Sequence, residues 1–371
     1  MNTPYLEIVQ TRQGWQATFA FQVFHLPAAE WLAMRWGFNA GALIEEALDR
    51  YKLFIESQSL SEAAFLANDQ LADRTLALRG INLPGTGLQM ALLGKASAPE
   101  KAQAQQAARD YAREVFSTFP YDFSVQPAEE KADFDRLYGR EFFSKNPQAA
   151  SIQRAMAFIP PMEKHQSFAG TWQSSARANE QVWRALSNTP KPAMLNITLQ
   201  PSIMYEGEKE MLLDAKKWID EIRSEKDEDE FADEDAEEAA LVYAAHLAWA
   251  EGYIKRRLAP WKKYFLLQIH VLAEGLVDEN LLRSIGATIT RDTNEAFQPG
   301  FQIVRPNSRD EEKEWRERIR SLDFAANSMH INDLADVDEA FAVFRLPYRP
   351  EAGLPGTNFI SAVKGPPTPS G

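Results

Sequence analysis

The densest group of residues able to bind a charged partner lies between positions 255 and 263. Its members are Lys255, Arg256, Arg257, Trp261, Lys262 and Lys263. Cations bind phosphate and an indole can stack on a base, so this composition is typical of contacts with DNA or a partner. Cations also stabilise the C-terminus of a helix, and a tryptophan can cover a sheet. The net charge of −13 at pH 7 favours the helix end over nucleic acid.

An acidic segment supplies the opposite charge. Between positions 220 and 238 twelve acids stand against two bases, while the rest of the chain is nearly neutral. An EF-hand loop requires a glycine at its sixth position, and residues 227–238 contain no glycine. We expect a solvated turn between helices, whose functional use would be contact with a basic partner. The residues predicted for that contact are Asp227, Glu228, Asp229, Glu230, Asp233 and Asp235.

The stretch from Gly85 to Ser97 comes nearest to a phosphate-binding loop. Six residues separate Gly87 from the Gly94-Lys95 pair, where a P-loop has four between its first glycine and Gly-Lys. Ala96 stands where a P-loop has the Ser or Thr that binds Mg²⁺. The intervening residues are apolar and have a strand-like pattern, which predicts a hairpin rather than a nucleotide site.

Other catalytic and metal-binding motifs are absent from the sequence. The chain has five histidines, none spaced like a local metal site, and no cysteine. It also lacks Gly-x-Ser-x-Gly. We therefore predict no catalytic residue, no metal and no cofactor in this chain, and no enzyme activity of its own. A catalytic triad assembled through space remains an alternative.

The elements that would position these residues predict an α+β fold. Strands are expected at 5–11, 15–24, 74–83, 88–95, 122–126, 193–200, 264–272 and 300–305, and helices at 28–57, 99–118, 208–223, 234–258 and 278–290. Strand–loop–helix units recur, which indicates a sheet of ferredoxin-like character with helices on one face. The acidic turn between two long helical patterns predicts an antiparallel helical hairpin projecting from the sheet.

Composition divides the chain into five predicted segments. They are 1–70 (hairpin plus helix), 71–207 (a first α+β set), 208–260 (the helical hairpin), 261–345 (a second α+β unit) and 346–371 (a Pro/Gly-rich lead-in tail). No stretch predicts a transmembrane helix, and the start has no signal-peptide pattern. We expect a cytoplasmic protein that inserts into no membrane and reaches a membrane complex only through a partner.

Five segments within residues 75–371 carry a family resemblance. They are 111–127, 191–201, the helical hairpin, 265–275, and the sequence Phe344-Arg345-Leu346-Pro347 with Gly353-Leu354-Pro355-Gly356. Their layout resembles the region that precedes the motor domain in HerA/FtsK-type ATPases and their relatives in conjugative type IV secretion. The resemblance implies a non-catalytic assembly or docking domain of a DNA-translocating ATPase system.

The motor's Walker A, Walker B and arginine finger have no counterpart in this sequence. The resemblance therefore implies that ATP and Mg²⁺ enter only through a P-loop motor in cis or in trans. It further implies an oligomeric assembly and indirect contact with DNA. The alternatives are a free-standing interaction or structural protein, and a carboxylate-dependent hydrolase or nuclease.

Overall fold

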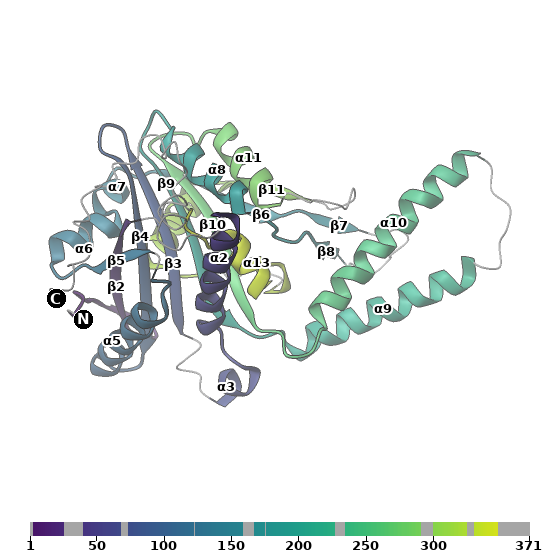
Figure 1. Cartoon of the computed structure of the whole chain (residues 1–371), viewed down its shortest axis with the longest axis horizontal. Coiled ribbons are helices and arrows are strands. Elements are labelled where there is room, and N and C mark those ends of the chain that lie inside the picture. Colours follow the sequence, from purple (N-terminus) through teal and green to yellow (C-terminus); the bar gives the residue numbers. More distant parts are fainter. Residues whose placement is uncertain are drawn as a thin grey trace.

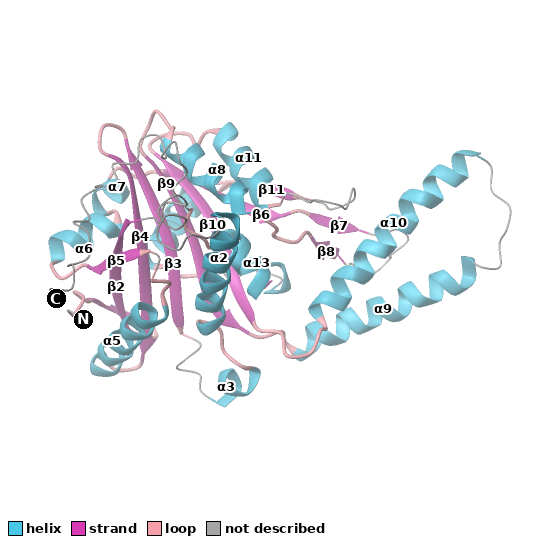
Figure 2. Cartoon of the chain, viewed as in Figure 1, coloured by secondary structure: helices cyan, strands magenta, loops and turns pink. Residues whose placement is uncertain are grey.

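The structure is a computed structural model that describes residues 3–25, 40–67, 73–121, 123–158, 167–174, 176–226, 234–290, 300–324 and 330–347. Within these ranges ten strands form one antiparallel sheet, and two short strands pair separately (Figures 1 and 2). Helices cover both faces of the sheet. The protein is therefore of the α+β class, as the sequence predicted.

The first half of the sheet has the chain order strand, helix, strand, strand, helix, strand. Its elements are β2 (Gly14–His25), α2 (Ala40–Ser57), β3 (Arg74–Leu83), β4 (Gly87–Ala98), α5 (Lys101–Thr118) and β5 (Ser124–Pro127). Across the sheet these strands lie in the order β3, β4, β2, β5. Strand β1 (Glu7–Thr11) shares the outer edge of β2 with β5, and α3 (Glu62–Ala67) follows α2.

The second half repeats this order. Its elements are β6 (Gln148–Arg154), α8 (Ala176–Ser187), β9 (Ala193–Ser202), β10 (Tyr264–Ala273), α11 (Glu279–Ile289) and β11 (Phe301–Val304). Across the sheet the strands lie in the order β9, β10, β6, β11, which matches the first half strand for strand. Because β3 pairs with β9, the two halves form one continuous sheet.

One face of the sheet carries the largest apolar cluster, packed under α2, α5, α8 and α11. Side chains alternate between the two faces of a strand. Leu76 and Leu78 of β3 accordingly enter this cluster, and Ala77 faces the other side. Trp183 of α8 lies so close to Gly80 that a Cβ atom there would come within 2.5 Å of the indole. Glycine at this strand position lets α8 approach the junction of the halves.

The opposite face is covered by α6 (Lys131–Tyr138), α7 (Arg140–Ser144) and α12 (Arg309–Ser321). The prediction of helices on one face is therefore wrong, because the strands also direct apolar side chains to this second face, and these helices cover them. Arg79 of β3 is fully buried beneath them. It donates hydrogen bonds to Asn196 Oδ1 on β9 (2.9 Å) and to the carbonyl oxygens of Tyr138 (2.6 Å) and Ile319 (2.7 Å). Burial lowers the pKa of Arg79 to about 10. This one side chain thus connects helices of both halves.

Helices α9 (Glu206–Lys226) and α10 (Glu234–Arg257) lie between β9 and β10 in the chain and extend away from the sheet (Figure 1). Close to the sheet, Ile219 of α9 and Tyr253 of α10 share an apolar cluster with Phe168 of β8 (Ser167–Ala169). Residues 227–233 lie outside the described residues, so the helical hairpin stays a prediction. The ferredoxin-like character of the repeated units is likewise a prediction.

Four short elements complete the described chain. They are β7 (Met156–Phe158), the 3₁₀ turn η1 (His330–Asn332), β12 (Leu334–Asp336) and α13 (Val337–Val343). β6 pairs with β10 over residues 269–273, and β12 pairs with the beginning of β10. Helix α13 is thereby placed beside the end of α10, which precedes β10 in the chain.

The predicted segments 1–70, 71–207 and 261–345 all contribute strands to the same sheet. The stretch from Gly85 to Ser97 is the β3–β4 turn and most of β4, which confirms the predicted hairpin. The predicted helix at 28–57 is described only as α2, since residues 26–39 lie outside the described ranges. The lead-in tail beyond Pro347 lies outside them too.

Candidate functional site

The basic run at 255–263 spans the last turn of α10, a turn, and the residues before β10. Its side chains fall into two sets, one paired with acids and one exposed. Arg256, Arg257 and Lys262 form ion pairs with Asp336 and Glu339, whereas Lys255 and Trp261 are exposed. This division decides what each residue can contact.

Arg257 forms the most deeply buried ion pair of the run. Its guanidinium lies 2.6 Å (Nη1) and 3.1 Å (Nη2) from the two carboxylate oxygens of Glu339 in α13, and both side chains have no exposed surface. The ring of Tyr253 lies 5.0 Å from the guanidinium carbon, and the Tyr264 hydroxyl donates to the carbonyl oxygen of Arg257. A charge buried this deeply must be paired to be stable.

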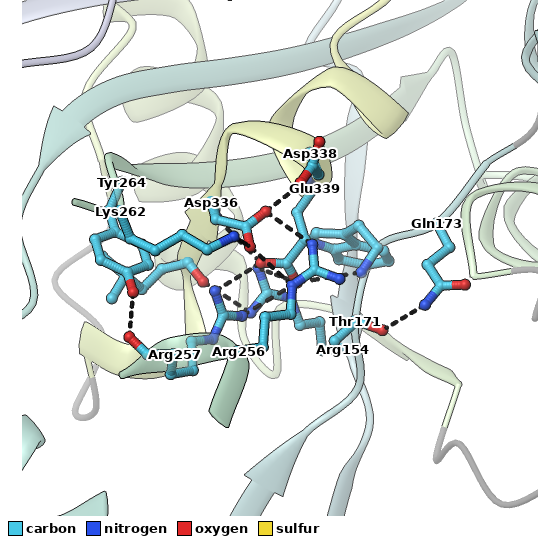
Figure 3. Close-up of polar contacts among 12 residues, drawn as sticks. Arg154, Thr171, Gln173, Arg256, Arg257, Lys262, Tyr264, Asp336, Asp338 and Glu339 are labelled. Atoms are coloured by element: carbon cyan, nitrogen blue, oxygen red, sulfur yellow. Dashed lines mark hydrogen bonds and ion pairs between the residues drawn. The ribbon is translucent and has the colours of Figure 1, made fainter. Parts of the chain in front are cut away.

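Asp336 forms ion pairs with Arg256 and Lys262 (Figure 3). Arg256 binds it through two parallel hydrogen bonds of 2.8 Å, and Lys262 Nζ lies 3.0 Å from Oδ2. Asp336 also caps α13: it accepts from the backbone N–H of Glu339, and Glu339 accepts from the backbone N–H of Asp336, both at 3.0 Å. This capping box places both carboxylates at the start of one helix, facing the end of α10.

Arg154, at the end of β6, is the third arginine of this cluster (Figure 3). It donates to the carbonyl oxygen of Leu334 at 2.9 Å and lies 3.6 Å from Glu339. The backbone N–H of Trp172 also donates to Glu339, at 3.3 Å. We call Arg154, Arg256, Arg257, Lys262, Asp336 and Glu339 the ion cluster. It joins β6, α10, the turn before β10, and α13.

Burial and pairing compete in setting the protonation of the ion cluster. Burial opposes ionisation of Asp336, but hydrogen bonds and charge from Arg256, together with the charge of Arg257, hold its pKa well below the usual range. Burial also opposes the charge on Arg257, yet the charge of Glu339 raises its pKa. For Arg154 burial prevails over Glu339 and lowers the pKa. The strongest pairing therefore lies between α10 and α13.

The outward-facing residues of the run form a different surface. Trp261 is 95% exposed and adopts a positive φ of 65°, a left-handed conformation that aromatic residues seldom adopt. Lys263 pairs with Glu56 of α2 at 3.1 Å. Of the six residues predicted to contact DNA or a partner, three form ion pairs with Asp336 or Glu339. Trp261, Lys255 and Lys263 are left nearer the surface.

The acidic residues of the ion cluster were not predicted from the sequence. Their signal is the Asp336-x-x-Glu339 spacing before the apolar residues of α13, which is typical of a capping box. Of the acidic contact residues predicted, Asp227, Glu228, Asp229, Glu230 and Asp233 lie outside the described residues. Asp235 lies in the first turn of α10.

A second polar group, also not predicted, links Ser202, His330 and Glu208. Ser202 Oγ lies 2.9 Å from His330 Nε2, and His330 Nδ1 lies 2.9 Å from Glu208 Oε1. This is the connectivity of a Ser–His–acid triad assembled through space. Ser202 is only 3% exposed, and the ring of Tyr205 packs 4.4 Å from the imidazole. The second oxygen of Glu208 caps the start of α9.

Carboxylates converging in a cavity would favour the hydrolase or nuclease alternative. Glu311, Asp323 and Asp333 line a cavity of about 300 Å³ between the sheet and α12. Asp323 pairs with Lys95, and Asp333 accepts a hydrogen bond from Gln268. Within the described ranges no three His, Asp or Glu side chains are grouped so that they could hold a metal ion.

Comparison with known proteins gives no relative from which function could be transferred. No protein-family model matches this chain, and no curated protein has significant sequence similarity to it. None of the described helices is both long and apolar enough to cross a membrane. Function must therefore be argued from the geometry above.

Proposed function

We propose that this chain is a docking domain of a HerA/FtsK-like or conjugation-type DNA-translocating ATPase system, without nucleotide turnover of its own. The observation that carries the proposal is the ion cluster, which fixes α10 to α13 through Arg257 and Glu339. Helix α10 projects from the body, and α13 is the last described helix before residues 344–347. The two parts that would meet partners are therefore connected to each other.

The exit of the chain from α13 is also fixed. The indole N–H of Trp183 donates to the carbonyl oxygen of Arg345 at 3.0 Å, and Leu346 is fully buried. A motor joined to, or bound near, residue 347 would be held in a defined orientation relative to α9 and α10. We further propose that the two halves of the sheet are ferredoxin-like repeats, because both follow the same strand order. A cytoplasmic location belongs to the same proposal.

The test first searches the coding DNA beyond residue 371 and the adjacent reading frame for a P-loop ATPase. The chain and the ATPase are co-expressed, and co-purification and ATP hydrolysis are measured. A variant in which a short Gly-Ser linker replaces residues 221–240 removes the outer parts of α9 and α10 but keeps their apolar base. We expect it to fold and to lose partner binding at least tenfold. A variant with exposed α12 acids replaced by Gln controls for the change in net charge.

Two results would overturn the proposal. One is ATP hydrolysis by the purified chain alone, at a rate that scales with its concentration through every purification step. The other is wild-type chain that fails to bind the ATPase under conditions in which both are folded.

A second candidate function is acyl hydrolysis by Ser202. In that reaction Oγ would attack a carbonyl carbon, His330 would take the Oγ proton and return it to the leaving group, and Glu208 would orient the imidazole. The low exposure of Ser202 gives a substrate little access, which ranks this candidate second. A fluorophosphonate probe tests it: labelling of wild type but not of Ser202→Ala or His330→Gln would support it. An unlabelled wild-type protein would remove it.

A further inference from the structure

A large cavity opens beside the outward part of the basic run. It has a volume of about 740 Å³ and lies between α3, the start of α9 and the turn that precedes β10. Met204, Leu258 and Tyr264 supply apolar wall, and Trp261 and Leu66 line it as well. We call this cavity the tryptophan groove. Its size suits one or two large side chains from a partner.

Two of its apolar residues are unusually exposed. Trp261 is 95% exposed and Leu66 is 68% exposed. A left-handed backbone costs an ordinary residue about 1–2 kcal/mol, and packing of the indole does not compensate for that cost here. Strained backbone and an exposed tryptophan together mark a binding anchor, since tryptophan is enriched among the residues that dominate interface energies.

The rim of the tryptophan groove is positively charged. Lys209, Lys262 and Lys263 line it, against a single lining acid, Glu62. Each of these lysines also pairs with an acid of the body, including Glu56 and Glu62. A duplex-binding surface neutralises a long run of phosphates, whereas this groove is lined by three lysines beside an apolar wall. An acidic protein segment with one apolar anchor matches the groove better.

The chain itself contains such a segment. Residues 227–233 read Asp-Glu-Asp-Glu-Phe-Ala-Asp, so Phe231 stands as a single aromatic residue among acids. We propose that residues 227–233 of a second copy of this chain dock in the tryptophan groove. Phe231 contacts Trp261 and the apolar wall, and the flanking carboxylates face Lys209, Lys262 and Lys263.

The segment must come from another copy because of the lengths of α9 and α10. Helix α10 has 24 residues between Glu234 and the groove end at Arg257, and α9 has 21. At 1.5 Å per residue these helices place Lys226 and Glu234, which flank the segment, roughly 30–36 Å from the groove of their own chain. The contact is therefore between two different surfaces. Copies joined in this way add head to tail, into a ring or an open filament.

Two single variants test the proposal, since each removes one side of the contact. Trp261→Ala removes the indole of the groove, and Phe231→Ala removes the aromatic ring of the segment. Neither substitution changes a residue of the described core. Leu276→Ala is the matched control, because Leu276 is 71% exposed and lies beyond the opposite end of β10. Molar mass is measured by sedimentation velocity over a range of concentrations, with the motor ATPase absent so that the result does not depend on the proposed function.

We expect wild type and Leu276→Ala to assemble beyond the dimer as concentration rises. Each test variant should associate at least tenfold more weakly. A mixture of the two test variants should form a 1:1 dimer and nothing larger, since it retains one intact groove and one intact segment. A monomeric wild type, or test variants that assemble like wild type, would overturn the proposal. So would a Trp261→Ala variant that loses duplex DNA binding while keeping self-association.

Discussion

The two halves of the sheet differ most in how their second and third strands are joined. β3 and β4 are connected by the tight turn at residues 84–86, whereas β9 and β10 are separated by residues 203–263, including α9 and α10. The strand order is nevertheless the same in both halves. Loop closure costs grow only slowly with loop length, so a hairpin connection can accept a long insertion without altering the sheet. New function can therefore be added at this connection.

Ion pairs at the end of the insertion anchor it to the rest of the protein. Arg256 and Arg257 end α10, and their acidic partners come from α13, which follows the second half. In the first half the tight turn between β3 and β4 has no such requirement. The halves thus share a strand order and differ in the ion pairs that anchor the insertion between β9 and β10.

The largest effect is expected from Glu339→Ala. It leaves the fully buried Arg257 without its partner, and breaking such a pair typically costs about 3–5 kcal/mol. Urea denaturation should show a lower midpoint, or an unfolded second half. As control, Glu46→Ala removes an exposed ion pair with Arg50 and should cost about 0.5 kcal/mol or less. Equal effects of the two variants would contradict the assignment of α10 anchorage to the ion cluster.

Arg79→Ala should separate the two halves. The change deletes three buried hydrogen bonds and leaves a cavity, for a loss of about 3 kcal/mol in the free energy of unfolding. Because Arg79 contacts helices of both halves, calorimetry should show a broadened or split transition. Arg136→Ala, at an exposed position on α6, is the control. A sharp single transition at the wild-type temperature would show that Arg79 does not couple the halves.

His270 predicts a pH dependence confined to the second half. Burial and the nearby charge of Arg318 lower the pKa of His270 to about 4, against about 6.5 in an unfolded chain. The folded state then binds fewer protons than the unfolded state between these values. Stability is therefore full above pH 6.5 and decreases as pH falls toward 4, by on the order of 2 kcal/mol. His270→Gln should remove this part of the slope.

Denaturant midpoints of wild type and His270→Gln, measured from pH 8 to pH 4, test this sign. The two curves should run parallel above pH 7 and diverge below it. Below about pH 4 the low pKa of Asp336 adds a second loss that both proteins share. Identical slopes between pH 6.5 and 4 would show that His270 is not held neutral.

The smallest effect is expected from Trp261→Asn. Asparagine adopts the left-handed conformation more readily than tryptophan, so the variant should be more stable by about 0.5–1 kcal/mol. A small rise in melting temperature checks this. A decrease in stability would mean that the indole packs on the body and is not kept exposed for a partner.

The sequence predicted the strands that are rich in apolar and β-branched residues. β3, β9 and β10 were located within a few residues because their composition and pattern are strand-like. β6 was missed, since Gln148–Arg154 reads Gln-Ala-Ala-Ser-Ile-Gln-Arg, which has little strand propensity. It becomes a strand by pairing with both β10 and β11, and this tertiary context overrides local preference.

The sequence predicted the cations of the candidate site but not their acidic partners, because tertiary context brings the two together. The cations of the run at 255–263 are visible as a group, but their partners Asp336 and Glu339 stand about eighty positions later. Only the pairing of β12 with β10 brings these acids to the end of α10. Composition could identify the charged run, whereas the inward or outward direction of each side chain depended on the fold.

The anchorage of α10 at one end has a mechanical consequence. The helix is about 36 Å long, from 24 residues at 1.5 Å each, and its described ion pairs to α13 all lie in its last turn or just beyond it. Its apolar contacts with α9 and β8 lie in the same half of the helix, so α10 can act as a lever whose fulcrum is the ion cluster together with these contacts. A tilt of about 10° at that fulcrum would move the far end by roughly 6 Å, a displacement that follows from the helix length. Small rearrangements around Asp336 and Glu339 would be magnified at the far, N-terminal end of α10. A force applied at that end would in turn exert a torque on α13.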